Sequence, residues 1–512
     1  MDVKEKVTIA CARLCAKDMR PFDAVSGSGF KAVAEELIKI GARYGNVNAQ
    51  DILPHPTTVS RKVAELAGAL RDDIMPEIQL ALSESRCAIT TDMWTDDFRK
   101  IAYTTATAHY IDSKWSMHCH VVFTCDFPNE RKTGDNIRKE LVRRFMKLGV
   151  CDATLKKATF VTNQGANIVC ALQTYDRIDC SAHVLNTVLR NTFAEEFVAN
   201  EVPLVSETVQ ATKAVVTFLK QSGLASQLKQ TVSQEVPTRW NSKVSMLKSV
   251  CSQFEEIEAL LESRNNPIME GVNKSTLKDL IEFLQPFKDA SDALEEEKRP
   301  TLPLVVLYAS ALRKHLEAAP VSAVEAVEID KLKARARPFL NTKLKISLLH
   351  KTATFLWPQF RQLRMLPEGE RLEVYAHVRE LLARITEAMS QGGEDETNND
   401  VREPASKRRC LGLFLDWCDE EDDKTPTDEM EEYLHGKKEY SCSGVSDLCD
   451  FWREHEKEFP KLALLSKRIL CIPATGASSE RNFSAAGYIM QARRTCLKKE
   501  SMDNLLFLHK NM

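Results

Sequence analysis

The chain has 512 residues, 43% of them apolar, and is too long to fold as one compact unit, so we expect about two to four domains. The formal net charge of −3 excludes a global field that would draw the chain onto nucleic acid, and any DNA binding must therefore use local basic faces. Fifteen scattered cysteines indicate reduced thiols of an intracellular protein. No apolar run approaches the length that crosses a bilayer, which predicts a protein without membrane partners.

The first part of the chain, residues 1–75, is predicted to be a small helical domain. Apolar residues recur at helical spacing from Phe30 to Ile38. A proline-containing turn at residues 53–56 precedes a second helical pattern over residues 57–70.

Residues 86–179 show a different period, which predicts a sheet. A β-branched run ends at Thr91, residues 101–111 alternate like a strand, and residues 115–127 alternate like its hairpin partner. A helical pattern follows over residues 133–148, and then an apolar run closes at Thr162. Three strands, a helix and a fourth strand are therefore expected in this range.

Residues 180–440 are mostly helical in pattern and are expected to form an all-α insertion that interrupts the sheet domain. Residues 391–432, at the end of this insertion, are rich in acidic and small polar residues and are predicted to be disordered. Residues 445–512 are again apolar-periodic and are expected to complete the sheet domain. The predicted class is therefore α/β (α+β), with a mixed sheet, an all-α insertion and an N-terminal helical domain.

Three short segments, residues 89–96, 160–167 and 478–484, carry the candidate chemistry. Asp92 ends the first predicted strand, Asn163 follows the fourth, and Glu480 opens a helix after Pro473. A strand-ending acid also caps turns, and an acid at a helix start also follows from capping and the helix dipole, so each residue alone has a structural explanation. Carboxylates that converge from two strand ends and a later helix are typical of sites that hold two divalent cations on a phosphodiester.

Together the three segments resemble the catalytic blocks of hAT-superfamily DNA transposases of the Hermes and hobo type. The resemblance implies an RNase H-like fold, cut-and-paste DNA transposition and Mg²⁺ or Mn²⁺ held by residues at the positions of Asp92, Asn163 and Glu480. This family has aspartate where the chain has Asn163. An amide removes one negative charge and leaves a single carbonyl acceptor, so we predict severely impaired or absent strand cleavage.

Two further blocks resemble DNA-contacting segments of the same family. Cys180 and His183 match a Cys-x-x-His block beside the active site, where the histidine would face DNA. No second ligand pair follows at finger spacing, so no zinc is expected. Arg239 and Trp240 match a block whose tryptophan stacks on an extruded base, although an isolated tryptophan is more often part of a core.

Residues 18–70 look like the helical segment that precedes the catalytic core in Hermes-like transposases, and the family's BED zinc finger is absent from the sequence. The resemblance implies partners of two kinds, transposon terminal inverted repeats and further copies of the chain, in a dimer or a higher oligomer. It also implies that residues 445–512 include the family's C-terminal dimerisation region. It implies a nuclear location, and a basic segment at residues 404–409 is a candidate import signal. The alternative is a domesticated transposase-derived DNA-binding regulator, a dimer with no nuclease activity.

Overall fold

The computed structural model describes residues 2–96, 99–236, 240–317, 327–390, 428–435, 444, 448–489 and 497–512. The chain divides into two compact units, Met1–Glu65 and Leu66–Met512. The four predicted domain ranges remain predictions. The candidate import segment and residues 391–427 of the predicted acidic segment lie outside the described residues.

The first unit is helical, as the sequence predicts. It contains the elements α1 (Val3–Lys17), η1 (Phe22–Ser26), α2 (Ser28–Tyr44), α3 (Ala49–Ile52) and the first turns of α4 (Pro56–Ser83). Asn48 caps α3 by accepting a hydrogen bond from the Gln50 amide at 3.1 Å. The apolar side chains of α2 stay exposed, with Ile38 at 70%.

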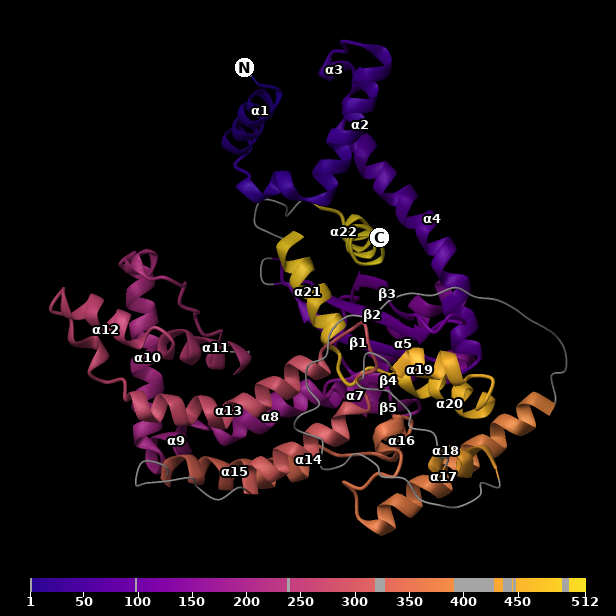
Figure 1. The fold of residues 1–512 in the computed structure, drawn as a ribbon. Coiled ribbons are helices and arrows are strands. Elements are labelled where there is room, and N and C mark those ends of the chain that lie inside the picture. The colour runs from indigo at the N-terminus through magenta and orange to yellow at the C-terminus, as the bar shows by residue number, and fades with distance from the viewer. Residues whose placement is uncertain are drawn as a thin grey trace. The chain divides into compact units, whose positions relative to one another are not determined.

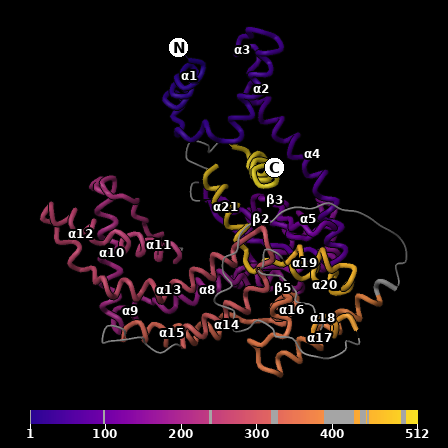
Figure 2. Tube along the Cα trace, viewed as in Figure 1, coloured from indigo at the N-terminus to yellow at the C-terminus, as the bar shows by residue number. Residues whose placement is uncertain are grey.

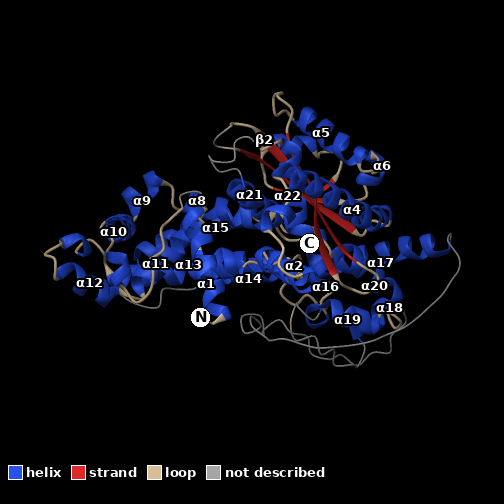
Figure 3. Cartoon of the chain, turned by 90° about the horizontal axis from the view of Figure 1, so that it is seen from above, coloured by secondary structure: helices blue, strands red, loops and turns tan. Residues whose placement is uncertain are grey.

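The second unit contains one five-stranded sheet, whose strands are drawn in red in Figure 3. The strands are β1 (Cys87–Thr95), β2 (Ala102–Ile111), β3 (Met117–Asp126), β4 (Thr159–Thr162) and β5 (Asp176–Asp179), in the order β3-β2-β1-β4-β5. β1 pairs with β2 in antiparallel register and with β4 in parallel register. The sheet is mixed and RNase H-like, and the predicted α/β class is confirmed. The first four strands were predicted, and β5 was not.

Both faces of the sheet are buried. Ile89 and Phe160 pack into one core with α5 (Gly134–Lys147) and α7 (Ala166–Ala171). Their neighbours Ala88 and Val161 belong to the opposite core, which continues into the helices that follow the sheet. This alternation follows from the two-residue period of strand side chains.

The elements described between Ser181 and Ser390 are all helical, which agrees with the predicted insertion (Figures 1 and 2). They are α8 (Ser181–Thr192), α9 (Glu195–Glu201), α10 (Pro203–Gln221), η2 (Leu224–Gln227), α11 (Trp240–Cys251), α12 (Phe254–Glu262), η3 (Pro267–Met269), α13 (Lys274–Leu294), α14 (Leu304–Glu317), α15 (Val327–Lys343), α16 (Leu348–Phe355), η5 (Pro358–Phe360) and α17 (Glu368–Ser390). The remaining helices are α6 (Asp152–Leu155), α18 (Glu429–His435), α19 (Leu448–His455), α20 (Pro460–Leu470), α21 (Ala477–Ile489) and α22 (Lys499–Asn511). Among the described helices, not one has the length and apolar character that crossing a bilayer needs.

The last helix, α22, covers the edge strand β3 with polar side chains. Asp503 Oδ1 accepts a hydrogen bond from the Thr124 amide at 2.6 Å. The Asn511 side chain pairs with both backbone groups of Val121, at 3.1 and 2.9 Å. Because these groups satisfy donors and acceptors that an open edge would leave free, the C-terminus of the chain completes the sheet.

Arg71 on α4 binds three side chains of α22. Arg71→Ala is therefore expected to lower the free energy of unfolding by about 2–3 kcal/mol. Its guanidinium binds Asp503 and Asn504, each at 2.8 Å, and lies 4.3 Å from the centre of the Phe507 ring. Urea unfolding and hydrogen exchange of the Val121 and Thr124 amides measure the loss. The exposed Arg264→Ala is the control, and an equal effect of both substitutions contradicts this role.

Candidate functional site

The candidate site begins where β1 and β4 lie side by side. The parallel register pairs Thr90 with Val161, which places Asp92 beside Asn163 two residues further along. Asp92 Oδ1 accepts hydrogen bonds from Asn163 Nδ2 at 2.9 Å and from the Met93 amide at 2.8 Å. Burial raises the pKa of Asp92, and the Glu480 charge raises it further, while the Met93 amide and the His183 charge act in the opposite sense.

Asn163 directs its amide nitrogen, not its oxygen, toward Asp92. Its Oδ1 accepts a hydrogen bond from the Gly165 amide at 2.9 Å and so closes the turn before α7. Hard cations such as Mg²⁺ take oxygen ligands, and an amide N–H₂ is a donor only. The residues present therefore fit a two-cation site only in part: Asp92 and Glu480 supply carboxylates, and Asn163 supplies a group that repels a cation.

Glu480 lies in the first turn of α21, and a buried polar network holds that helix against the sheet. Ser478 Oγ and Thr90 Oγ1 lie 2.9 Å apart, and Ser479 Oγ donates to Thr90 Oγ1 at 3.3 Å. Asn482 Nδ2 donates to Thr105 Oγ1 at 3.0 Å and also bonds Thr124. Sequence analysis did not identify this network, although Ser478 and Asn482 lie in the same segment as Glu480.

Cys180 connects three parts of the site. It follows β5 directly, is fully buried, and its amide donates to the carbonyl oxygen of Thr162 at 2.7 Å. Its sulfur accepts a hydrogen bond from the Gly476 amide at 3.1 Å, and Gly476 directly precedes α21. The sulfur also lies 3.3 Å from His183 Nδ1. Cys180 thus has a structural role that ties β4, α8 and the start of α21 together.

His183 lies beside the Glu480 carboxylate. Its Nδ1 lies 3.4 Å from Glu480 Oε1. The hydrogen bond with the Cys180 sulfur and the charges near it, including Glu480 and Asp92, raise the pKa of His183 to about 9, although desolvation opposes the rise. When protonated, the imidazole forms an ion pair with the Glu480 carboxylate.

A pocket of about 410 Å³ opens beside these groups, and His183, Trp240 and Glu480 line it together with Arg481. The Trp240 ring meets Phe287 edge-on, with 6.5 Å between the ring centres. Trp240 thus packs partly on the core and also lines the pocket, and its stacking on an extruded base remains a prediction. Arg239 lies outside the described residues. The pocket thus brings an imidazole, a carboxylate and an aromatic ring together in one lining.

Asp96 and Asp152 are close in sequence to the site residues, but each carboxylate binds another partner. Asp96 is buried, and its Oδ2 accepts hydrogen bonds from the amide and Nε of Arg99, at 3.1 and 3.3 Å. Asp152 lies in α6, before β4 begins, and pairs with Lys156 at 2.9 Å. Neither carboxylate replaces the one that Asn163 lacks.

Two buried histidines, His109 and His350, are expected to make the fold sensitive to acid. His109 lies 3.2 Å from Thr90 Oγ1, and burial lowers its pKa to about 4; burial likewise lowers that of His350 to about 4. Since the ordinary value is 6.5, the unfolded chain binds these protons first as pH falls. The free energy of unfolding is expected to decrease from about pH 6.5 down to about pH 4, by on the order of 3 kcal/mol per histidine.

Urea denaturation between pH 7.5 and pH 5 measures this dependence. His350→Gln is expected to flatten it, because the glutamine takes up no proton. The exposed His509→Gln is the control. A slope that His350→Gln leaves unchanged contradicts the assignment.

The fold and the site define an RNase H-like protein with a helical insertion. Three family models match successive parts of the chain. Residues 1–58 match the Hermes transposase DNA-binding domain, residues 178–286 the ZBED1 RNase-like helical domain, and residues 429–512 the hAT family C-terminal dimerisation region.

Individual proteins are also similar in sequence to large parts of the chain. The Hobo transposase of Drosophila melanogaster is 31% identical over 375 residues, which cover 72% of this chain and 55% of that protein. Human zinc finger protein 618 is 24% identical over 521 residues, 99% of this chain and 51% of that protein. The putative AC transposase of Zea mays is 22% identical over 478 residues, 83% of this chain and 56% of that protein. The chain thus spans about half the length of the relatives it matches, and it belongs to the hAT family of transposases and transposase-derived proteins.

Proposed function

We propose that this chain is a DNA-binding, self-associating protein of the hAT type whose metal-dependent strand cleavage is impaired by Asn163. The match of residues 1–58 to a DNA-binding domain and of residues 429–512 to a dimerisation region supports the first two properties. DNA carrying transposon terminal inverted repeats is the proposed ligand, and the nucleus is the proposed location.

One observation carries the proposal of impaired cleavage. Asn163 Nδ2 donates to Asp92 Oδ1 at 2.9 Å, so a donor lies where the family's carboxylate would bind a cation. Mg²⁺ or Mn²⁺ would supply electrostatic stabilisation of the transferring phosphate if bound by Asp92 and Glu480. In the unmodified chain, we expect Trp240 and His183 to bind distorted DNA without cutting it.

The alternative function is that of a domesticated regulator, a DNA-binding dimer with no nuclease activity. The same donor favours it, because the Asn163–Asp92 hydrogen bond stabilises the site without a cation. Two relatives that are not named as transposases, human zinc finger protein 618 and human zinc finger BED domain-containing protein 4, also match the chain along its length, which supports this alternative.

Sedimentation and a gel-shift assay of the full chain on duplex DNA test the binding proposal. We expect a dimer or a higher oligomer, and shifted DNA in the presence of EDTA, since binding through basic residues needs no divalent cation. A monomer that leaves all DNA unshifted at low salt contradicts the proposal.

A further inference from the structure

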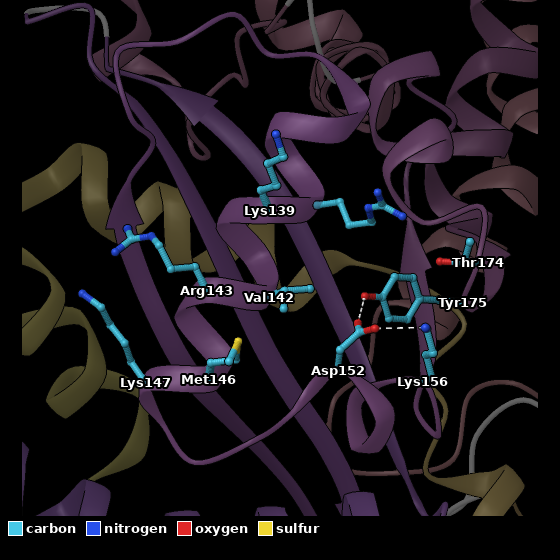
Figure 4. Close-up of a pocket in the computed structure, with 10 residues that line it drawn as sticks. Lys139, Val142, Arg143, Met146, Lys147, Asp152, Lys156, Thr174 and Tyr175 are labelled. Atoms are coloured by element: carbon cyan, nitrogen blue, oxygen red, sulfur yellow. Dashed lines mark hydrogen bonds and ion pairs between the residues drawn. The ribbon is translucent and has the colours of Figure 1, made fainter.

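The exposed side of α5 carries a row of cations that the candidate site does not use. Lys139, Arg143 and Lys147 lie at intervals of four residues, about 6 Å apart along the helix. Together with Arg138 and Lys156 they line an open pocket of about 750 Å³, shown in Figure 4. We call these five residues the α5 basic face.

Three cations of this face already pair with carboxylates: Arg138 lies 3.7 Å from Asp135, Arg143 pairs with Glu140, and Lys156 pairs with Asp152. Asp152 is the one carboxylate in the pocket lining, and it is occupied by Lys156 at 2.9 Å and by the Tyr175 hydroxyl (Figure 4). Within the described part of the chain, Lys139 and Lys147 have no carboxylate within 4.0 Å. Their ammonium groups are therefore available to an anionic partner.

Arg143 is held in place before any partner arrives. Its Nε and one terminal nitrogen donate to the two carboxylate oxygens of Glu140, at 2.8 and 2.6 Å. Glu140 is itself buried, whereas the Arg143 side chain is 47% exposed. Because the guanidinium has further N–H groups, it stays able to bind a phosphate while its conformation is already fixed.

The start of α5 lies near the edge of the sheet that bears the candidate site. Lys132, two residues before α5, donates to Thr95 Oγ1 at 2.9 Å, and Thr95 lies three residues past Asp92 on β1. From there α5 runs for fourteen residues, about 21 Å, and the chain then returns to the start of β4. At about 3.4 Å per phosphate along a strand, this length corresponds to about six base pairs.

We propose that the α5 basic face binds the phosphate backbone of duplex DNA that extends from the candidate site. The proposal rests on the DNA-binding function proposed above and identifies a second contact for it. The whole chain carries a net charge of −3, so DNA contact depends on local faces of this kind. A row of cations along one side of a helix can contact several phosphates of a backbone, and such contacts read no base sequence.

The test compares the full chain with the triple variant Lys139→Gln, Lys147→Gln, Lys156→Gln. A matched control removes the same charge elsewhere, through Lys345→Gln, Lys457→Gln and Lys461→Gln, which lie outside the α5 basic face. Affinity for two fluorescent 20-base-pair duplexes of unrelated sequence is measured across a range of NaCl concentrations. Thermal unfolding of each protein verifies that the substitutions leave the fold intact.

We expect the triple variant to bind both duplexes at least about tenfold more weakly, and the slope of log affinity against log salt to be shallower by about 2–3. The control triple keeps the affinity and slope of the unmodified protein. A triple variant that matches the control overturns the α5 basic face while leaving DNA binding standing. If the unmodified protein binds neither duplex, the proposed function itself fails. Weakening confined to one duplex sequence contradicts a backbone contact.

Discussion

Asn163→Asp is expected to raise Mg²⁺-dependent nicking of supercoiled plasmid DNA by about a thousandfold over the unmodified protein. The substitution replaces the N–H₂ group beside Asp92 with a second anionic oxygen donor. At an effective dielectric near 20, a unit charge about 4 Å away contributes roughly 4 kcal/mol, and each 1.36 kcal/mol in the transition state is about tenfold in rate. Three powers of ten follow from these two magnitudes.

The control for this gain is Asn200→Asp, an exposed asparagine outside the site. It adds the same charge and is expected to leave nicking at the background of the unmodified protein. Plasmid relaxation on agarose gels, with Mg²⁺ and with EDTA, gives the readout. Glu480-dependent nicking by the unmodified protein would show that Asn163 does not disable the site.

Glu480→Gln in the Asn163→Asp background is expected to remove the gain, again by about a thousandfold. Glu480 lies in the first turn of α21, and its carboxylate contacts His183 at 3.4 Å. Its side chain is 38% exposed, and the buried network at Ser478 and Asn482 holds the helix without it. The loss is therefore expected in activity and not in folding.

Glu500→Gln is the matched control, because Glu500 lies in the first turn of α22 as Glu480 lies in that of α21. Nicking that survives Glu480→Gln but falls with Glu500→Gln contradicts the assignment of the catalytic acid. Silence of Asn163→Asp itself, with DNA binding retained, favours the domesticated regulator.

The sequence predicts the parts of this fold whose pattern is local. The alternating runs before Ile111 and Phe127 became β2 and β3, and the segment after Pro473 became α21. β5 was missed, because Asp176–Asp179 contains one apolar residue and shows no alternation that a four-residue window can establish. Its place in the sheet comes from pairing with β4, which is a tertiary contact.

The candidate site also combines features that the local sequence predicts with features that depend on tertiary contacts. Asp92 and Asn163 could be paired from the sequence, because both follow strands that a sheet brings together. The role of Cys180 could not be predicted, since its contact with the Gly476 amide joins segments 296 residues apart. Nor does the sequence show which atom of Asn163 faces Asp92, because that depends on the turn at Gly165.

The most direct measurement is Mn²⁺ binding by isothermal titration calorimetry to the unmodified protein, Asn163→Asp, and Asn163→Asp with Glu480→Gln. We predict that Asn163→Asp binds Mn²⁺ about a thousandfold more tightly than the unmodified protein, by the same charge argument as above, and that Glu480→Gln reverses most of the increase. Equal Mn²⁺ affinity of the unmodified protein and Asn163→Asp would contradict the conclusion that Asn163 occupies the position of a missing metal ligand.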